Sequence, residues 1–347
     1  MTLHEFYQGK RVLVTGHTGF KGTWLCEILL QLGAEVTGYA LTPNTEPDLF
    51  TLTGMAGRMN SVIGDIRDYE SLKKCFDAAK PEVVFHLAAQ PIVKEGYRDP
   101  VGTYHTNVMG TVHVMDCIRA CPSVISVVNV TTDKVYAETG KASGYQEGDT
   151  LDGFDPYANS KSCSELVTAC YRRSFLEKLP VSTARAGNVI GGGDFAPNRI
   201  IPDCVRAAIA GEDIVLRNPY SIRPYQHVLE PLLVYLTIAM KQWEDPTLAG
   251  SYNVGPDAEG CVTTGELAEL FCNAYGGMSV RVQPDNGPHE ASFLKLDCAL
   301  LKEKFGWKPS ISVSDAVELT VEWTKVWQSG ASLLDCMSAQ INHALKK

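Results

Sequence analysis

The sequence lacks the features that mark several broad classes of protein. No Cys-x-x-Cys pair occurs among its 11 cysteines, so neither a zinc site nor a disulfide framework is predicted, and the thiols are expected to be reduced. It contains no run of about 18 apolar residues, the length that a membrane span requires. Residues 1–10 are polar and have no apolar centre of a signal peptide. These absences predict a cytoplasmic protein without a metal site.

Basic residues are also in short supply. The chain of 347 residues has 31 Lys and Arg against 40 Asp and Glu, a net charge of -9. An acidic surface repels the phosphates of nucleic acids, so a nucleic-acid partner is not expected. A few local arginines are still enough to bind a single nucleotide.

The first half of the chain alternates short apolar segments with helical patterns. Strands are expected at 11–15, 35–40, 61–64, 83–88, 124–130 and 181–186. Helices are expected at 21–32, 68–79, 99–120 and 157–176. This alternation predicts an α/β fold with a doubly wound parallel Rossmann sheet.

The pattern becomes irregular after about residue 190. Short strands are expected at 214–217 and 280–282, and helices at 230–243, 264–275 and 312–327. We therefore predict a Rossmann domain at 1–190, a smaller mixed α/β substrate domain at 191–330 and a C-terminal helix at 331–347. A segment near 220–255 is expected to return to the Rossmann sheet.

A glycine-rich loop follows the first strand. Gly16, Gly19 and Gly22 are three residues apart, at a junction of strand and helix. Glycines there let backbone amides approach a pyrophosphate, and the helix N-terminus stabilises its charge. The spacing departs from the usual GxGxxG, and three glycines alone can also form a tight turn. The position of the loop favours a dinucleotide site.

The second strand ends without an acidic residue. Gly38–Leu41 offers neither the Asp or Glu that binds the ribose of NAD nor an Arg for the phosphate of NADP. The sequence thus favours NAD without excluding NADP, and weak retention of the cofactor is predicted. Asp65 follows the third strand and is a candidate acceptor for the adenine amino group, unless it caps the next helix. His86 is expected to be a satisfied, partly buried histidine.

Two motifs carry the candidate chemistry. Tyr157 and Lys161 are four residues apart at the start of a helix, so they share one face. The ammonium group and a positive nicotinamide are expected to lower the tyrosine pKa and make Tyr157 a base for a hydroxyl proton. Thr132, Asp133 and Lys134 follow the fifth strand, where doubly wound sheets bind ligands. The alternative for these three is a turn with capping side chains.

Together the glycine loop and the Tyr157/Lys161 pair resemble the extended short-chain dehydrogenase/reductase superfamily. Thr132-Asp133 resembles its sugar-nucleotide 4,6-dehydratase branch. The stretches that resemble the members acting on CDP-glucose are 17–22, 132–134, 184–194, 223–230, 288–290 and 294–297. The resemblance implies a hydro-lyase that uses NAD catalytically to convert CDP-glucose into CDP-4-keto-6-deoxyglucose, and a homodimer or higher homo-oligomer.

The resemblance also implies a role for each catalytic residue. Tyr157 removes the proton of the carbon-4 hydroxyl as hydride passes to NAD, and Thr132 hydrogen-bonds that hydroxyl. Asp133 is protonated and gives its proton to the leaving carbon-6 hydroxyl, after which hydride returns to carbon 6. Lys134 stands where many dehydratases have a Glu as the carbon-5 base. A neutral lysine can fill that role only if its surroundings depress its pKa.

Further residues are assigned to the two ligands. The cofactor is expected to contact Gly16, His17, Thr18, Gly19, Phe20, Lys21, Gly22, Asp65, Ile66, Leu87, Ala88, Ala89, Asn107, Tyr157 and Lys161. The substrate is expected to contact Gln90, Asn188, Arg199, Arg217, Arg223, Tyr225 and His289. Arginine binds pyrophosphate bidentately, and a tyrosine can stack on the pyrimidine. The alternative for these substrate-side residues is a surface salt bridge or core packing.

Two other functions are compatible with these motifs. An epimerase of the same superfamily has no leaving water to protonate, so Asp133 argues against it. A non-catalytic dinucleotide sensor would not need Tyr157, Lys161, Thr132 and Asp133 together.

Helices 99–120 and 157–176 carry apolar residues on more than one face. The resemblance implies that they pair across a two-fold axis, and the alternative is packing on the sheet.

Overall fold

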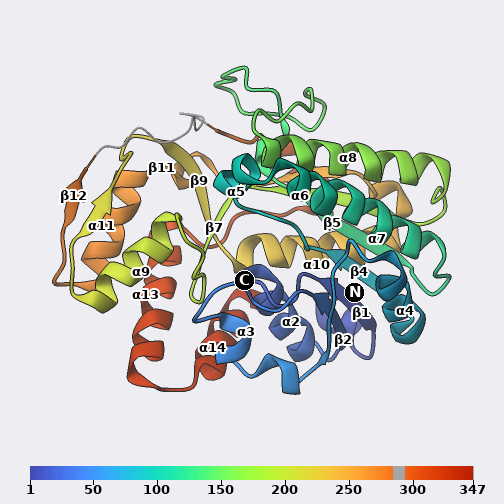
Figure 1. Ribbon diagram of the computed structural model, residues 1–347, viewed down its shortest axis with the longest axis horizontal. Coiled ribbons are helices and arrows are strands. Elements are labelled where there is room, and N and C mark those ends of the chain that lie inside the picture. The colour runs from blue at the N-terminus through green and yellow to red at the C-terminus, as the bar shows by residue number, and fades with distance from the viewer. Residues whose placement is uncertain (284–293, 347) are drawn as a thin grey trace.

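A seven-stranded parallel sheet forms the centre of the computed structural model, which describes residues 1–283 and 294–346 (Figure 1). Its order is β10-β6-β5-β4-β1-β2-β3, and every neighbouring pair is parallel. The strands are β1 (Arg11–Thr15), β2 (Glu35–Ala40), β3 (Asn60–Ile63), β4 (Val83–His86), β5 (Ser126–Val130), β6 (Val181–Ala186) and β10 (Ser251–Val254). The predicted parallel Rossmann sheet is confirmed.

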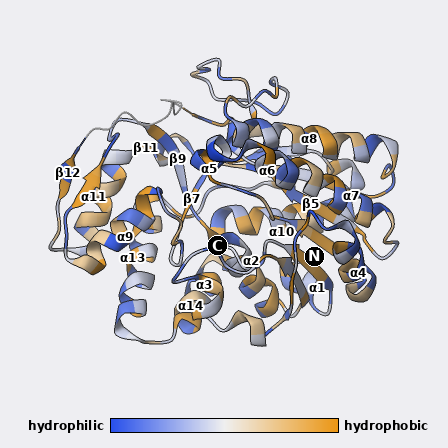
Figure 2. Cartoon of the chain, viewed as in Figure 1, coloured by the Kyte–Doolittle hydropathy of each residue, from blue (hydrophilic) through white to orange (hydrophobic). Residues whose placement is uncertain are grey.

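Helices cover both faces of the sheet, because successive strand residues point to opposite sides. Val12 and Val14 belong to one apolar cluster, whereas Leu13 belongs to the other. The first cluster includes α1 (Leu3–Tyr7), α2 (Phe20–Gln31), α10 (Leu229–Glu244) and α14 (Leu333–Leu345). The second includes α4 (Tyr69–Ala79), α7 (Gly110–Arg119) and part of α8 (Pro156–Ser174). Figure 2 shows hydrophobic residues gathered along the strands and the inner helix faces.

The expected long helix at 99–120 is interrupted. The chain forms α5 (Val93–Arg98) and α6 (Pro100–Tyr104), then a π-helical turn at His105–Met109, and only then α7. Such π turns often occur at functional sites. Here the turn carries Asn107, which is buried.

The second half of the chain adds two small sheets beside the main one (Figure 1). β7 (Asn188–Ile190), β9 (Ile222–His227) and β11 (Cys261–Thr263) form one of them, and β8 (Ile214–Leu216) pairs with β12 (Val280–Val282) in the other. Besides α10 and α14, this half contains the helices α9 (Ile200–Ala210), α11 (Thr264–Tyr275), α12 (Ala299–Phe305) and α13 (Val313–Ser329). The short helix α3 (Leu49–Leu52) lies earlier in the chain. β10 pairs with β6, so the segment near 220–255 supplies a strand to the large sheet. The proposed division into domains stays a prediction.

All 11 cysteines are free, as expected from their irregular spacing. Within residues 1–283 and 294–346, no helix has the length and apolar character to cross a membrane. The same ranges hold no group of three His, Cys, Asp or Glu side chains suited to a metal ion.

Candidate active site

Each of the three glycines after β1 lies in a different environment. Gly16 has a φ of +81°, and a Cβ there would lie 2.8 Å from the amide nitrogen of Ala88. A Cβ on Gly22 would lie 2.1 Å from the carbonyl oxygen of Gly16. Gly19 is exposed, precedes α2, and would bring a Cβ no closer than 3.4 Å to any neighbour. The loop therefore has no room for a side chain at Gly16 or Gly22, and it is open to solvent at Gly19, next to the N-terminus of α2. This arrangement fits a pyrophosphate.

The side chains of His17 and Thr18 hold this loop from within. His17 is fully buried, its Nε2 lies 2.7 Å from Ser61 Oγ, and its ring meets Phe50 edge to face. Burial lowers the pKa of His17 to about 4, so the ring is neutral. Thr18 Oγ1 donates to the carbonyl oxygen of Leu41 at 2.8 Å. Any contact of these two residues with a cofactor is left to their backbone.

The Lys21 side chain extends away from the glycine loop, toward Lys161 and Asp133. Its Nζ donates to the hydroxyl of Tyr235 at 3.3 Å. Burial, together with the cations of Arg199 and Lys161 and against the charge of Asp133, lowers the pKa of Lys21 to about 7. The cofactor contact predicted for Lys21 stays a prediction. Its charge interacts with those of Arg199, Lys161 and Asp133. Phe20, its half-buried neighbour, packs toward Gly191.

The loop after β4 forms the wall opposite Gly16. Thr15 Oγ1 accepts hydrogen bonds from the amides of Leu87 and Ala88, both at 3.2 Å, and lies 2.7 Å from His86 Nδ1. The other nitrogen of His86, Nε2, lies 3.2 Å from Thr111 Oγ1. His86 is thus a buried, satisfied histidine, as expected. Leu87, Ala88 and Ala89 are half-buried, so they can line a cofactor pocket.

Asn107 and Gln90 bind each other. Asn107 Oδ1 accepts from the Gln90 amide at 2.8 Å, and Asn107 Nδ2 donates to the Gln90 carbonyl at 3.0 Å and to Ser160 Oγ at 2.9 Å. The Gln90 side chain donates to Thr103 Oγ1 at 2.9 Å and accepts from the Ile92 amide at 2.6 Å. Both amides therefore fix the loop after β4. Contacts with a ligand through their side chains stay predictions.

Asp65 does not cap a helix. Asp68 caps α4 instead, accepting from the amide of Ser71 at 3.1 Å. Asp65 binds the backbone amide of Arg67 at 2.8 Å and its guanidinium at 2.6 Å. Ile66 is buried against Gly110. Arg67 would have to share the Asp65 carboxylate with an adenine amino group, a competition that the sequence did not indicate.

The start of α8 fixes the candidate base. Asp155 Oδ1 accepts from the amides of Tyr157 and Ala158 at 2.9 and 3.0 Å, and Pro156 occupies the first helical turn. This N-cap directs Tyr157 toward β5. Lys161 Nζ, one turn later, donates to the Val130 carbonyl at 2.9 Å. Both side chains are buried.

Burial governs the ionisation of this pair. Burial raises the pKa of Tyr157 to about 12, although a hydrogen bond with Thr132 and the charge of Arg199 act to lower it. Burial also lowers the pKa of Lys161 to about 8, and Glu165 opposes that shift. In the protein without a cofactor, desolvation thus outweighs the groups that lower the tyrosine pKa, and the lowered pKa expected with both Lys161 and a cationic nicotinamide stays a prediction. The cationic nicotinamide that was expected beside the phenol is still needed.

Asp133 has the environment of an acid rather than a base. It is buried, Oδ1 accepts from Thr132 Oγ1 at 3.0 Å, and Oδ2 has no hydrogen-bond partner among the described residues. A Cβ on Gly187 would lie 3.0 Å from Oδ2, so that glycine leaves the carboxyl its space. Burial raises the pKa of Asp133, against the opposing charges of Lys134 and Arg223. Thr132 also caps the 3₁₀ turn Asp133–Val135, its hydroxyl accepting from the Lys134 amide at 3.5 Å, so the alternative of a capped turn holds for Thr132.

The structure separates the substrate-side candidates. Arg199 binds Asp194 at 3.3 Å, yet its charge also reaches Tyr157 and Lys21. Arg223 is buried beside Asp133 and donates to the Ile222 carbonyl at 3.0 Å. Their contacts with a pyrophosphate stay predictions.

The other substrate-side candidates are more scattered. Asn188 pairs with Tyr225 between β7 and β9, and Tyr225 is buried in the main apolar cluster. Arg217 is exposed beyond the end of β8. His289 lies outside the described residues.

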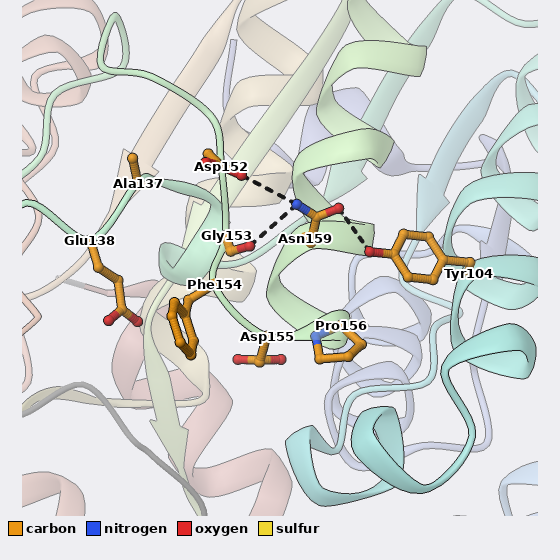
Figure 3. A pocket seen from close by; sticks show the side chains of 9 residues that line it. All are labelled: Tyr104, Ala137, Glu138, Asp152, Gly153, Phe154, Asp155, Pro156 and Asn159. Atoms are coloured by element: carbon orange, nitrogen blue, oxygen red, sulfur yellow. Dashed lines mark hydrogen bonds between the residues drawn. The ribbon is translucent and has the colours of Figure 1, made fainter.

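A hollow of about 550 Å³ lies beside the start of α8 (Figure 3). Tyr104 OH donates to Asn159 Oδ1 at 2.8 Å at one side of it. The carboxyls of Glu138, Asp152 and Asp155 also line it. Carboxylates repel phosphate, so this hollow is not the nucleotide site.

Sequence reasoning missed a buried ion pair behind the base. Glu165 and Arg185 are joined at 2.9 Å, with both side chains almost fully buried. A charged residue within the apolar strand 181–186 was the available signal, because a charge is rarely buried without a partner.

The sequence is similar to those of known sugar-nucleotide dehydratases. The family model for GDP-mannose 4,6 dehydratase matches residues 13–320. A CDP-glucose 4,6-dehydratase of Salmonella typhimurium is 43% identical over 347 residues, covering 97% of each chain. A dTDP-glucose 4,6-dehydratase of Xanthomonas campestris is 26% identical, covering 92% of this chain and 95% of the relative.

Solved structures share the fold. A UDP-glucose 4-epimerase of Thermus thermophilus in complex with NAD has a TM-score of 0.79 and 25% identity, covering 90% of this chain and 98% of that one. A dTDP-glucose 4,6-dehydratase of Bacillus anthracis in complex with NAD has a TM-score of 0.76 and 22% identity, covering 93% and 99%. Epimerases and dehydratases thus share this architecture, so only the side chains can separate the two reactions.

Proposed function

Because the chain belongs to the GDP-mannose 4,6 dehydratase family, we propose that it is a hydro-lyase that removes water from CDP-glucose, with NAD as its cofactor. The product is CDP-4-keto-6-deoxyglucose, an intermediate of the kind used in deoxysugar biosynthesis. The substrate assignment is supported by the 43% identity to the Salmonella typhimurium enzyme over nearly the whole chain.

The observation that carries this proposal is the buried Asp133 carboxyl. Burial raises its pKa, and Oδ2 has no hydrogen-bond partner among the described residues, so this carboxyl is suited to donate a proton to a substrate. A 4,6-dehydration needs such a donor for the departing carbon-6 hydroxyl. A 4-epimerisation has no leaving group and needs no such donor.

The cofactor fits the loop after β1. A Cβ on Gly16 would collide with the backbone of Ala88 and one on Gly22 with the carbonyl of Gly16, while the exposed Gly19 leaves the N-terminus of α2 accessible to a pyrophosphate. NAD, when bound, takes hydride from carbon 4 and returns it to carbon 6. Asp65 would serve the adenosine end, and the half-buried Leu87, Ala88 and Ala89 would line the wall.

The residues of the chain supply the proton transfers. Tyr157 accepts the proton of the carbon-4 hydroxyl, and Thr132 hydrogen-bonds the same oxygen. Once carbon 4 is a ketone, the proton on carbon 5 becomes acidic, and Lys134 removes it. Asp133 then protonates the carbon-6 hydroxyl, which leaves as water. When hydride returns to carbon 6, Lys134 gives its proton back to carbon 5, which completes the 4-keto-6-deoxy sugar. Lys161 remains charged beside the base and stabilises its phenolate.

The phosphates of the substrate are assigned to arginines. Arg199 and Arg223 have charges that reach Tyr157 and Asp133, respectively, so a nucleotide diphosphate bound by them would lie next to the reacting sugar. Arg217 is exposed at the end of β8, and its role depends on whether the substrate extends that far. Asn188, Gln90 and Tyr225 complete the proposed contacts.

We further propose a homodimer formed through α6, the π turn and α8. Val101, Met109 and Leu166 on these elements, and Phe175 directly after α8, are large apolar side chains that are 77, 44, 56 and 55% exposed. Large apolar side chains that lie together on a surface are typical of an interface, and the proposed dimer would cover these four. Light scattering on wild type and a Leu166→Glu variant tests it, and an unchanged mass for the variant contradicts it.

The free cysteines support a cytoplasmic location.

The decisive experiment uses purified protein, NAD and four nucleotide sugars: CDP-glucose, UDP-glucose, dTDP-glucose and GDP-mannose. The expected result is loss of one water from CDP-glucose, measured by mass spectrometry and by the alkaline absorbance of the 4-keto sugar. Water loss from another sugar alone would keep the mechanism and reject the substrate. Epimerised product, or no reaction with NAD bound, would favour the epimerase or the sensor instead.

A further inference from the structure

A buried carboxylate lies one helical turn beyond the candidate lysine. Glu165 follows Lys161 by four residues in α8, so both side chains lie on the same helix face. Glu165 is 3% exposed, and an ionised carboxylate so deeply buried requires strong partners. The reaction described above assigns it no role.

Glu165 binds the segment after β5 and two residues of β6. Its Oε1 accepts from Thr131 Oγ1 at 2.5 Å. Its Oε2 accepts from Thr183 Oγ1 at 2.7 Å and from the Arg185 guanidinium at 2.9 Å. Thr131 immediately precedes Thr132 and Asp133, so the first of these bonds fixes the segment that carries the acid. The other two anchor the carboxylate to β6.

The charges around Lys161 make the same carboxylate important for its ionisation. The charge of Lys161 acts on Lys21 of α2 and on the neutral His86 of β4. Glu165 is the anion whose charge raises the pKa of Lys161. Without Glu165, the buried Lys161 and the buried Arg185 would both lose their anionic neighbour.

We propose that Glu165 is a positioning residue of the dehydration, which keeps Lys161 charged and holds Thr131, and with it Thr132 and Asp133, in place. It acts through these neighbours and touches neither substrate nor cofactor. The proposal rests on the proposed function for its activity measurement alone, because the charge of Lys161 can be measured without any reaction.

The first test compares Glu165→Gln with wild type and with Glu27→Gln as a matched control. Glu27 is also a buried glutamate with an arginine partner, Arg58, but it lies on α2 away from the catalytic segment. With CDP-glucose and saturating NAD, the alkaline limb of the kcat profile should move down by about one pH unit in Glu165→Gln, because a lost buried charge shifts a pKa by this order. The control should keep the wild-type limb. An unchanged limb in a folded Glu165→Gln protein overturns the proposal.

A second measurement does not depend on turnover. The NMR signal of the Lys161 ε-carbon, assigned with Lys161→Arg in lysine-labelled protein, reports the protonation of Lys161 directly. Its midpoint should fall in Glu165→Gln and stay in Glu27→Gln. If wild type dehydrates no nucleotide sugar, the proposed function fails while this titration still decides the role of Glu165.

A third comparison covers the outcome in which Glu165→Gln does not fold. Thr131→Val and Thr183→Val each remove one hydrogen bond to the same carboxylate and leave its charge intact. Thr131→Val should lower kcat about 10-fold with little change in KM, the loss expected for one misplaced catalytic group. Thr183→Val should stay near wild type. Equal losses in the two variants would mean that the bonds serve stability only, and would overturn the positioning role.

Discussion

Thr132 donates from its Oγ1 to Oδ1 of Asp133 at 3.0 Å, while Oδ2 of the same carboxyl has no partner among the described residues. One oxygen is therefore fixed and the other is left for a substrate. Burial raises the pKa of Asp133 above its ordinary 3.8, so the proton resides on the acid over a wider pH range. This arrangement separates the donor of a proton from the residue that orients it.

Asp133→Asn should stop water loss but permit the first oxidation. An amide keeps the size of the carboxyl and can no longer protonate a leaving hydroxyl. Reduced nicotinamide should therefore accumulate, seen by its absorbance, while mass spectrometry detects no dehydrated sugar. Asp152→Asn, a change of the same kind at an exposed carboxyl, is the control. Normal dehydration by Asp133→Asn would remove the residue from the mechanism.

The phenol of Tyr157 should titrate differently with and without cofactor. In the protein alone its pKa is about 12, so activity requires that NAD lower it. The difference in phenolate absorbance between wild type and Tyr157→Phe isolates this one group. With NAD the midpoint should fall by more than one unit, and kcat should rise as pH increases through the new value. An unchanged midpoint would show that the cofactor does not activate the phenol, and Tyr157→Phe should lose about 10²–10⁴-fold in kcat.

Lys161 makes stability depend on pH. Its folded pKa of about 8 lies below the ordinary 10.5, so between these values the unfolded chain binds more protons than the folded one. Stability relative to Lys161→Met should therefore rise as pH increases from about 8 to 10.5, by about 3 kcal/mol. Below that window both states are protonated and the difference is constant. Urea unfolding of both proteins at matched pH measures it, and a fall with pH would contradict the assignment.

Lys134 is the candidate carbon-5 base. Lys134→Ala should slow the exchange of the carbon-5 proton with solvent deuterium by at least 10-fold, as the loss of a positioned base does. The side-chain change leaves Thr132 and Asp133 in place, so oxidation at carbon 4 should persist. Mass spectrometry of recovered sugar gives both results. Exchange at the wild-type rate would assign the base elsewhere.

The glycines of the loop allow a matched pair of alanine substitutions. A Cβ on Gly22 would lie 2.1 Å from the Gly16 carbonyl, whereas on Gly19 its nearest neighbour would be 3.4 Å away. Gly22→Ala should lower the free energy of unfolding by about 2 kcal/mol or more. Gly19→Ala should fold normally and weaken NAD binding, because Gly19 faces the proposed pyrophosphate. Thermal unfolding and calorimetry distinguish the two, and equal stability would reject the packing argument.

Local sequence determined much of the scaffold. Each strand of the large sheet from 11 to 186 was predicted within two residues of its observed ends, because a buried parallel strand is a continuous apolar run. The Asp155 cap and the shared face of Tyr157 and Lys161 follow from helical spacing, which needs no tertiary contact. The glycine loop was likewise readable from its place after the first strand.

Tertiary structure decided what these residues do. β7 and β11 have three residues each, too short for a pattern, and they exist only because β9 pairs with them. The direction of His17, the bonds between Asn107 and Gln90, and the Asp65–Arg67 pair depend on neighbours distant in sequence or on turn geometry. The raised pKa values of Tyr157 and Asp133 arise from burial, a property of the assembled site. Sequence names the groups that carry protons, and the fold sets how tightly each of them holds one.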